Sequence, residues 1–127
     1  MLNRICIMGR LTAAPELRYT QQNTPVASFT LAVDRDYQQG GSEKQTDFIP
    51  CVAWRGTAEF VSKYFTKGSM AAVSGRLQLR DWTDKDGNKR RTAEVVAESI
   101  YFGESKKRDT SPDVQFEEIP DDGELPF

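Results

Sequence analysis

The sequence contains no histidine, and its two cysteines, Cys6 and Cys51, lack the spacing of metal ligands. The absence of histidine removes the commonest general base and metal ligand of enzymes. No serine or cysteine has an evident base partner, and no glycine-rich loop ends in the Gly-Lys pair that binds phosphates in many nucleotide-binding proteins. These absences disfavour a nuclease or any other enzyme, and they predict no cofactor and no metal.

The sequence also lacks a long apolar run and a signal-peptide pattern, which predicts a cytoplasmic protein without a membrane span. Both cysteines lie in apolar, strand-like stretches. We therefore expect two small buried hydrophobic side chains in a reducing compartment. A length of 127 residues, 38% of them hydrophobic, is enough for one domain with a core and a tail.

Charge is distributed unevenly along the chain. Residues 1–108 contain all 17 lysines and arginines beside 12 acids, a net charge of +5, whereas residues 109–127 contain seven acids and no base. The net charge of −2 therefore hides a basic domain and an acidic tail. The tail should compete with a nucleic acid for the domain.

Five stretches have the alternating or apolar pattern of strands. We place them at residues 3–10, 26–37, 46–55, 69–82 and 91–102. Pro50 indicates a sheet edge or a bulge, and Gly75 indicates a bend or bulge. Asp86-Gly87 predicts a hairpin between the last two strands.

One helix is expected at residues 56–68, with Thr57 as its N-cap and Gly68 just after its end. The order of three strands, one helix and two strands matches an all-β, five-stranded OB-fold barrel with the helix between strands three and four. The aromatic face of the helix would plug one end of the barrel, and four phenylalanines are assigned to the core: Phe29, Phe60, Phe65 and Phe102. We expect this domain to span residues 1–104. A flexible linker at 105–120 and an acidic tip at 121–127 would follow, forming a disordered tail.

Aromatic and basic side chains alternate on two of the expected strands. On the fourth strand one face carries Arg76, Gln78, Arg80 and Trp82, and the opposite face carries Leu77 and Leu79, which we assign to the core. On the third strand Phe48, Pro50, Val52 and Trp54 share a face. Periodicity alone leaves open whether Trp54 and Phe48 point outward or into the core. Tyr37 ends the second strand.

Exposed aromatic rings between arginines suit single-stranded nucleic acid, because bases stack on the rings and cations neutralise phosphates. A duplex hides its base faces and would bind such a surface poorly. We predict stacking on Tyr37, Phe48, Trp54 and Trp82. We predict phosphate contacts at Arg10, Arg35, Arg55, Arg76 and Arg80. Two other hypotheses stay open: an RNA-binding module, and an accessory OB-fold module that mainly bridges replication proteins.

The chain resembles the bacterial-type single-stranded DNA-binding proteins, including their phage-borne relatives. The resemblance rests on NRICIMGRLTAAPELRY, VASFTLAVDR, the strand that ends in Trp54, AEFVSKYFTKGSMAAVSGRLQLRDWTDKDG, and the acidic end with LPF. It implies an OB fold, a homotetramer, and coating of DNA single strands during replication, recombination and repair. The same four aromatic positions take the stacking role, although members of the family often have tryptophan where this chain has Tyr37 and Phe48.

The resemblance also implies a role for the tip. In this family an acidic run before an apolar residue, proline and phenylalanine docks onto replication, recombination and repair proteins. Here the docking residues would be Asp121, Asp122, Glu124, Leu125, Pro126 and Phe127. Phe127 would fill an apolar pocket while its carboxylate and the neighbouring acids meet basic residues of the partner. Gly123 interrupts the acidic run, and the linker is short for the family.

Overall fold

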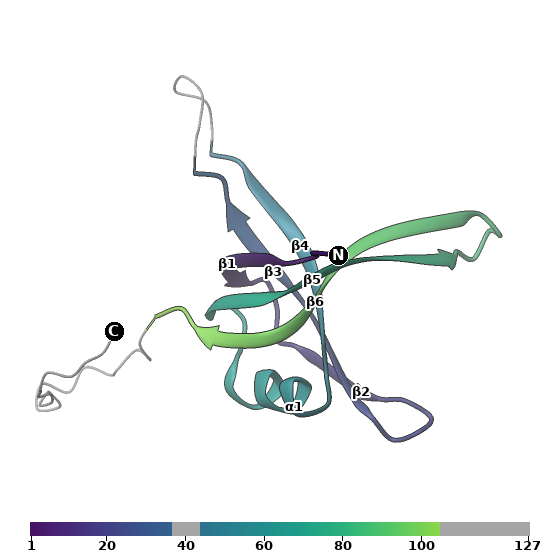
Figure 1. Cartoon of the computed structure of the whole chain (residues 1–127), viewed down its shortest axis with the longest axis horizontal. Helices are drawn as coiled ribbons and strands as arrows, with labels where there is room; N and C mark the ends of the chain where they lie inside the picture. The colour runs from purple at the N-terminus through teal and green to yellow at the C-terminus, as the bar shows by residue number, and fades with distance from the viewer. Residues whose placement is uncertain (37–43, 105–127) are drawn as a thin grey trace, which may run out of the picture.

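The computed structural model describes residues 1–36 and 44–104. The chain forms a barrel of strands with one helix beneath it and a long hairpin that projects to one side (Figure 1). The elements are β1 (Ile5–Leu11), β2 (Glu16–Tyr19), β3 (Pro25–Asp34), β4 (Thr46–Trp54), α1 (Arg55–Tyr64), β5 (Met70–Thr83) and β6 (Lys89–Phe102). No helix in these two ranges is long and apolar enough to cross a membrane.

Five strands close into a ring. The sheet order is β1-β5-β6-β4-β3-β2, and β1 also pairs with β3, which joins the two sides of the sheet. All pairings are antiparallel except β4 with β6, which is parallel from Cys51 to Ala53 on β4. The ring and the helix between β4 and β5 confirm the expected all-β OB-fold barrel.

The short strand β2 was not predicted. It extends the sheet outside the ring and, among the strands in residues 1–36 and 44–104, pairs only with β3. Its four residues, ELRY, alternate between polar and apolar types, but they are all exposed and the stretch is too short to indicate a strand. Their strand conformation comes from backbone hydrogen bonding to β3, which sequence periodicity does not report.

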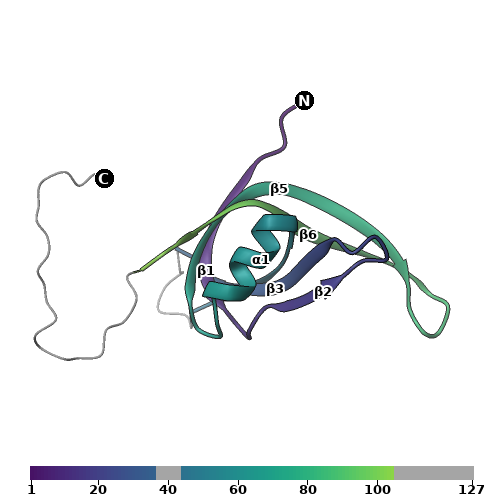
Figure 2. The same ribbon diagram turned by 90° about the horizontal axis from the view of Figure 1, so that it is seen from below.

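The core is built from the inward-facing residues of the ring and from one face of α1. On β3 the expected alternation holds, because Ala27, Phe29 and Leu31 are buried. Seen from below, α1 lies across one end of the barrel (Figure 2). Val61 and Phe65 are almost fully buried there, which confirms that the helix closes this end.

The ends of the helix differ from the prediction. The helix begins at Arg55, directly after β4, so Thr57 is not its N-cap. Trp54 stands at the N-cap position without a side-chain capping bond, and Arg55 takes a left-handed φ of 54°. The helix ends at Tyr64, so Gly68, with a φ of +88°, belongs to the following turn.

Four residues that were expected to be buried are exposed. The β5–β6 hairpin runs beyond the barrel, so Leu77 and Leu79 are 44% and 57% exposed despite their apolar pattern. Phe102 is exposed at the end of β6, although its ring stacks on Phe65 with centroids 4.7 Å apart. Cys6 is also exposed. A strand pattern shows which residues share a face but not where the barrel beneath them ends.

The other cysteine is buried as expected. Cys51 on β4 belongs to the core, and burial raises the pKa of its thiol to about 12. Next to it, Pro50 precedes the first residue of β4 that pairs with β6. On the side of β4 that pairs with β6, Pro50 therefore lies just outside the paired stretch. A proline has no backbone N–H to donate, so this position agrees with the sheet edge that the sequence predicts.

Both turn predictions on the long hairpin are confirmed. The pairing of β5 with β6 shifts register between Ser74 and Gly75, the position of the expected bulge. At the hairpin tip Gly87 has a φ of +86°, which suits glycine. Asp84 Oδ1 accepts hydrogen bonds from the backbone N–H groups of Asp86 and Asn88. The bond from Asn88 is the main cause of the lowered pKa of Asp84.

Candidate nucleic-acid interface

The strand registers bring aromatic and basic side chains onto one outer surface. Residues that pair across neighbouring strands point to the same side of a sheet. Val52 of β4 pairs with Val96 of β6, which pairs with Arg76 of β5, so alternate residues on these strands share a side. We call this surface the groove face. Its side chains include Arg18, Ser28, Thr30, Phe48, Pro50, Val52, Trp54, Arg76, Gln78, Arg80, Trp82 and Glu94.

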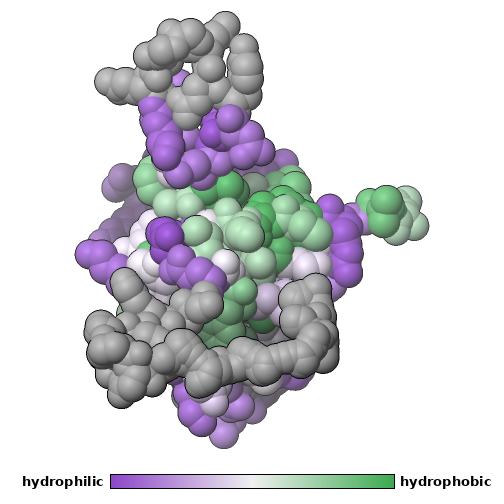
Figure 3. All heavy atoms as spheres, turned by 90° about the vertical axis from the view of Figure 1, so that its left-hand side faces the viewer, coloured by the Kyte–Doolittle hydropathy of each residue, from purple (hydrophilic) through white to green (hydrophobic). Residues whose placement is uncertain are grey.

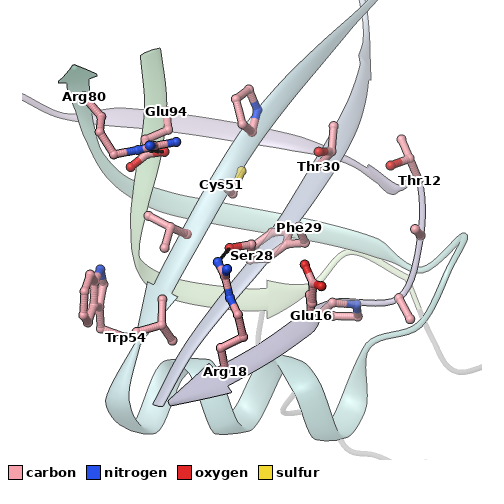
Figure 4. A pocket seen from close by; sticks show the side chains of 16 residues that line it. Thr12, Glu16, Arg18, Ser28, Phe29, Thr30, Cys51, Trp54, Arg80 and Glu94 are labelled. Carbon is pink, nitrogen blue, oxygen red and sulfur yellow. Dashed lines mark hydrogen bonds and ion pairs between the residues drawn. The ribbon is translucent and has the colours of Figure 1, made fainter. Parts of the chain in front are cut away.

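A groove of about 910 Å³ lies on this face. It crosses β2, β3 and β4, and it reaches Arg80 of β5 and Glu94 of β6. In the close view Trp54 and Arg18 lie toward α1, and Arg80 with Glu94 lies farther from the helix (Figure 4). The groove therefore has an aromatic ring and a cation at one end and an ion pair at the other.

Three of the four predicted stacking residues lie in the described part of the chain, and all three are exposed. Phe48 is 65% exposed, Trp54 42% and Trp82 41%. Trp54 borders the groove, Phe48 lies farther along β4, and Trp82 lies on the projecting hairpin. These exposures settle the question that periodicity left open, because Cys51 and Ala53 occupy the buried side of β4. Tyr37 lies outside the described residues.

The indole of Trp82 is held by a hydrogen bond. Its Nε1–H donates to Thr92 Oγ1 across the hairpin at 2.8 Å. This bond limits rotation of the ring. Arg90, its cross-strand partner on β6, lies beside it and forms an ion pair with Asp84 Oδ2 at 2.9 Å. A partly exposed ring in a defined orientation loses little further freedom when a base stacks on it.

Two predicted phosphate-binding arginines share the groove face with the aromatic rings. Arg80 Nε lies 3.4 Å from Glu94 Oε1, and Arg76 Nη1 lies 3.6 Å from Glu98 Oε2. Both pairs are long, and both guanidinium groups are about half exposed. The Arg76–Glu98 pair is exposed on both sides and contributes little to stability, so an incoming phosphate can replace Glu98 at small cost, whereas the Glu94 side chain is only 12% exposed.

The other three predicted arginines lie apart from this cluster. Arg35 makes two bonds to the carboxylate of Asp47, and the hydrogen bond from Arg35 is the main cause of the lowered pKa of Asp47. Arg10 does not line the groove; its guanidinium binds Glu104 and the carbonyl oxygen of Gly68. Arg55 is exposed directly after Trp54. The structure thus brings together Arg76, Arg80, Trp54 and Trp82 but leaves Arg10 elsewhere.

Sequence reasoning missed several groove residues, among them Arg18 and Glu94. Arg18, on the unpredicted strand β2, bonds to Ser28 Oγ at 3.4 Å, and no acid pairs with it among the described residues. Glu94 lines the groove from β6. The alternation in ELRY and in RTAEVV was the available signal for these two positions, but it could not show that the strands carrying them border the same groove.

Comparison with known proteins places the chain in a family. The model of the single-strand binding protein family matches residues 2–103, which is nearly all of the described barrel. The chain belongs to this family. It is a family of binding proteins and not of enzymes, as the lack of histidine and of catalytic motifs predicts.

Individual relatives agree with the family match. The chain is 50% identical to single-stranded DNA-binding protein 3 of Listeria innocua, over 84% of this chain and 67% of that protein. It is 42% identical to a single-stranded DNA-binding protein of Caldanaerobacter subterraneus, over 96% and 90%. Identity to the Staphylococcus aureus single-stranded DNA-binding protein is 47%, over 94% and 77%. The chain therefore spans about two thirds of the length of the Listeria protein and most of the Caldanaerobacter one.

Proposed function

We propose that the protein binds single-stranded DNA with little sequence preference and protects it. The observation that carries this proposal is the groove face, where exposed aromatic rings and half-exposed arginines share one side of the sheet. Stacking accepts every base, because each has a π face, and is worth about 1–3 kcal/mol per base. The names of the relatives support DNA as the ligand.

The proposed path follows the exposed rings. Bases stack on Trp54 and Phe48 along β4 and on Trp82 of the hairpin, with Tyr37 as a further stacking residue. Phosphates bind the half-exposed guanidinium groups of Arg76 and Arg80, and at Arg76 the phosphate replaces the exposed carboxylate of Glu98. Arg18 adds a phosphate contact in the groove, and Arg35, Arg55 and Arg10 add contacts outside it. Counterion release should make the affinity fall as salt rises.

Intrinsic fluorescence provides the direct test, because Trp54 and Trp82 are the two tryptophans of the chain. We expect poly-thymidine to quench the emission strongly, duplex of equal length to quench it weakly, and salt to reverse the effect. An RNA oligomer of matched sequence measures the preference for DNA. Equal quenching by single strand and duplex, or none by either, would contradict the proposal.

We further propose that the protein acts in the cytoplasm during replication, recombination and repair. In this proposal residues 121–127 recruit partner proteins, through the docking residues named above, while the barrel holds DNA. The pattern of acids before Leu125, Pro126 and Phe127 supports a partner with an apolar pocket and a basic rim. Binding of a peptide with this sequence to such a partner, against one that lacks Phe127, tests the proposal.

The acidic tail should weaken DNA binding by competing for the basic domain. Deleting residues 109–127 removes seven acids and no base. We expect the truncated protein to bind oligo-dT roughly five- to tenfold more tightly at low salt, because opposite charges attract strongly there. The gain should vanish near 1 M salt, where the Debye length is about 3 Å.

A full-length variant with the seven tail acids changed to amides separates charge from chain length. It should behave like the truncated protein, since the competition depends on charge. If neither variant binds more tightly than the natural chain at low salt, the tail does not compete with DNA.

A second exposed surface supports assembly into a homotetramer. Cys6, Met8, Ala72, Ser74 and Tyr101 lie on the outer side of β1, β5 and β6, and they border an apolar depression of about 370 Å³. Met8 and Tyr101 are more than half exposed in the single chain. The side of the molecule where β6 ends also has apolar surface in its middle (Figure 3). Contiguous apolar area of this kind is typical of an interface between copies.

Introducing a charge there should break the assembly. We expect Tyr101→Glu to lower the mass measured by light scattering from four chains to two or one, because the carboxylate would be buried unpaired. Tyr19→Glu, an equally exposed position on β2, serves as the control and should leave the mass unchanged. An unchanged mass for Tyr101→Glu would place the interface elsewhere.

A further inference from the structure

An acid occupies the middle of the groove face. Glu94 of β6 pairs with Gln78 of β5 on one side, and on the other it precedes the parallel pairing of β6 with β4. Its side chain is only 12% exposed, yet it lines the groove together with Trp54 and Arg80. A carboxylate at this place repels phosphates, so general affinity for a polyanion does not explain it.

The ion pair with Arg80 occupies only one of the two carboxylate oxygens of Glu94. The pair is made by one oxygen, Oε1, to Nε of Arg80 at the long distance of 3.4 Å. No hydrogen bond joins the second oxygen, Oε2, to any residue in the ranges 1–36 and 44–104. The side chains drawn in the close view show Glu94 beside Arg80 at the end of the groove away from α1 (Figure 4). A ligand in the groove therefore meets a carboxylate with acceptor capacity to spare.

A carboxylate accepts hydrogen bonds and donates none. Cytosine offers an exocyclic amino group that carboxylates bind in known DNA complexes. Thymine carries carbonyl oxygens on both sides of its single N–H, and these oxygens repel a carboxylate. The two pyrimidines are similar in size and stacking area, so the edge that each one turns toward Glu94 is the main difference between them.

We propose that Glu94 is a specificity-determining residue, which favours a base with an exocyclic amino group, cytosine above all, over thymine at this point of the groove. The inference rests on the proposed binding of single-stranded DNA and adds a local bias to it. Stacking elsewhere on the groove face keeps overall binding tolerant of sequence. The bias acts on one base position per chain.

The test compares affinities for labelled oligo-dC and oligo-dT of about ten nucleotides, a length within the usual range for one OB fold, by anisotropy at fixed salt. Glu94→Gln keeps the size of the side chain but adds an amide donor that suits thymine O4. We expect the ratio of the dC to the dT affinity to fall about tenfold in this variant, the size of one good base contact. Glu94→Ala removes the acceptor and should lower the ratio in the same direction.

Glu98→Gln is the matched control, since Glu98 on β6 pairs with Arg4 and Arg76 but does not line the groove. It removes the same charge, so it should tighten binding to both oligomers equally and leave the ratio unchanged. If Glu94→Gln also leaves the ratio unchanged, Glu94 only positions Arg80 and the inference is wrong. If the natural protein binds neither oligomer, the proposed function itself fails, which is a different result.

Discussion

Replacing Trp54 and Trp82 together by alanine should reduce the affinity for oligo-dT at least about thirtyfold. Each ring is expected to carry one stacked base, and each lost stack costs about 1–3 kcal/mol. Both indoles are partly exposed on the groove face, so their removal leaves no large cavity in the core. The loss should therefore appear in the binding isotherm and not in the melting temperature.

Leu79→Ala is a suitable control for this experiment. Leu79 lies on the same projecting hairpin as Trp82, is 57% exposed, and faces the opposite side of the sheet. Its loss should leave the affinity within about twofold, because a surface truncation away from the path changes little. An equal loss in both proteins would mean that the hairpin matters through its shape and not through stacking. Retained affinity in the double variant would exclude the proposed path.

The faces of the strands could be predicted from the sequence because side-chain alternation in a strand is local. Phe48 and Trp54 share one side of β4 in the sequence pattern and in the structure. Alternation could not show how far the barrel extends beneath a strand. The sequence pattern predicts that Leu77 and Leu79 belong to the core, but they lie on the part of β5 that projects beyond the barrel. The inner side of a strand is buried only where another layer covers it.

The composition of the groove depends on pairings between strands that are distant in the sequence. Arg18 reaches the groove because β2 pairs with β3, and Glu94 reaches it because β6 runs parallel to β4. Neither pairing can be recognised from the sequence of the paired strands. For Arg10 the sequence was misleading in the opposite direction. It lies on a basic, strand-like stretch, but the strand pairings place it outside the groove.

The second large effect concerns Gly75, where β5 turns from the barrel into the hairpin. The register with β6 shifts between Ser74 and Gly75, and a Cβ added at Gly75 would collide with the carbonyl oxygen of Val96. Backbone atoms cannot move aside as a flexible side chain can, so Gly75→Ala must push the two strands apart. We expect a loss of about 3 kcal/mol in the free energy of unfolding. The melting temperature should fall by roughly 15 °C, measured by circular dichroism.

Gly56→Ala provides the contrast, because nothing lies within 4 Å of a Cβ at this position in the first turn of α1. Alanine is the better helix former, so this variant should gain up to about 1 kcal/mol. The bulge also aims the hairpin that carries Arg76, Arg80 and Trp82. Below its melting temperature Gly75→Ala should therefore bind oligo-dT more weakly than Gly56→Ala does. If Gly75→Ala loses stability but keeps full affinity, the barrel needs the bulge and the groove face does not.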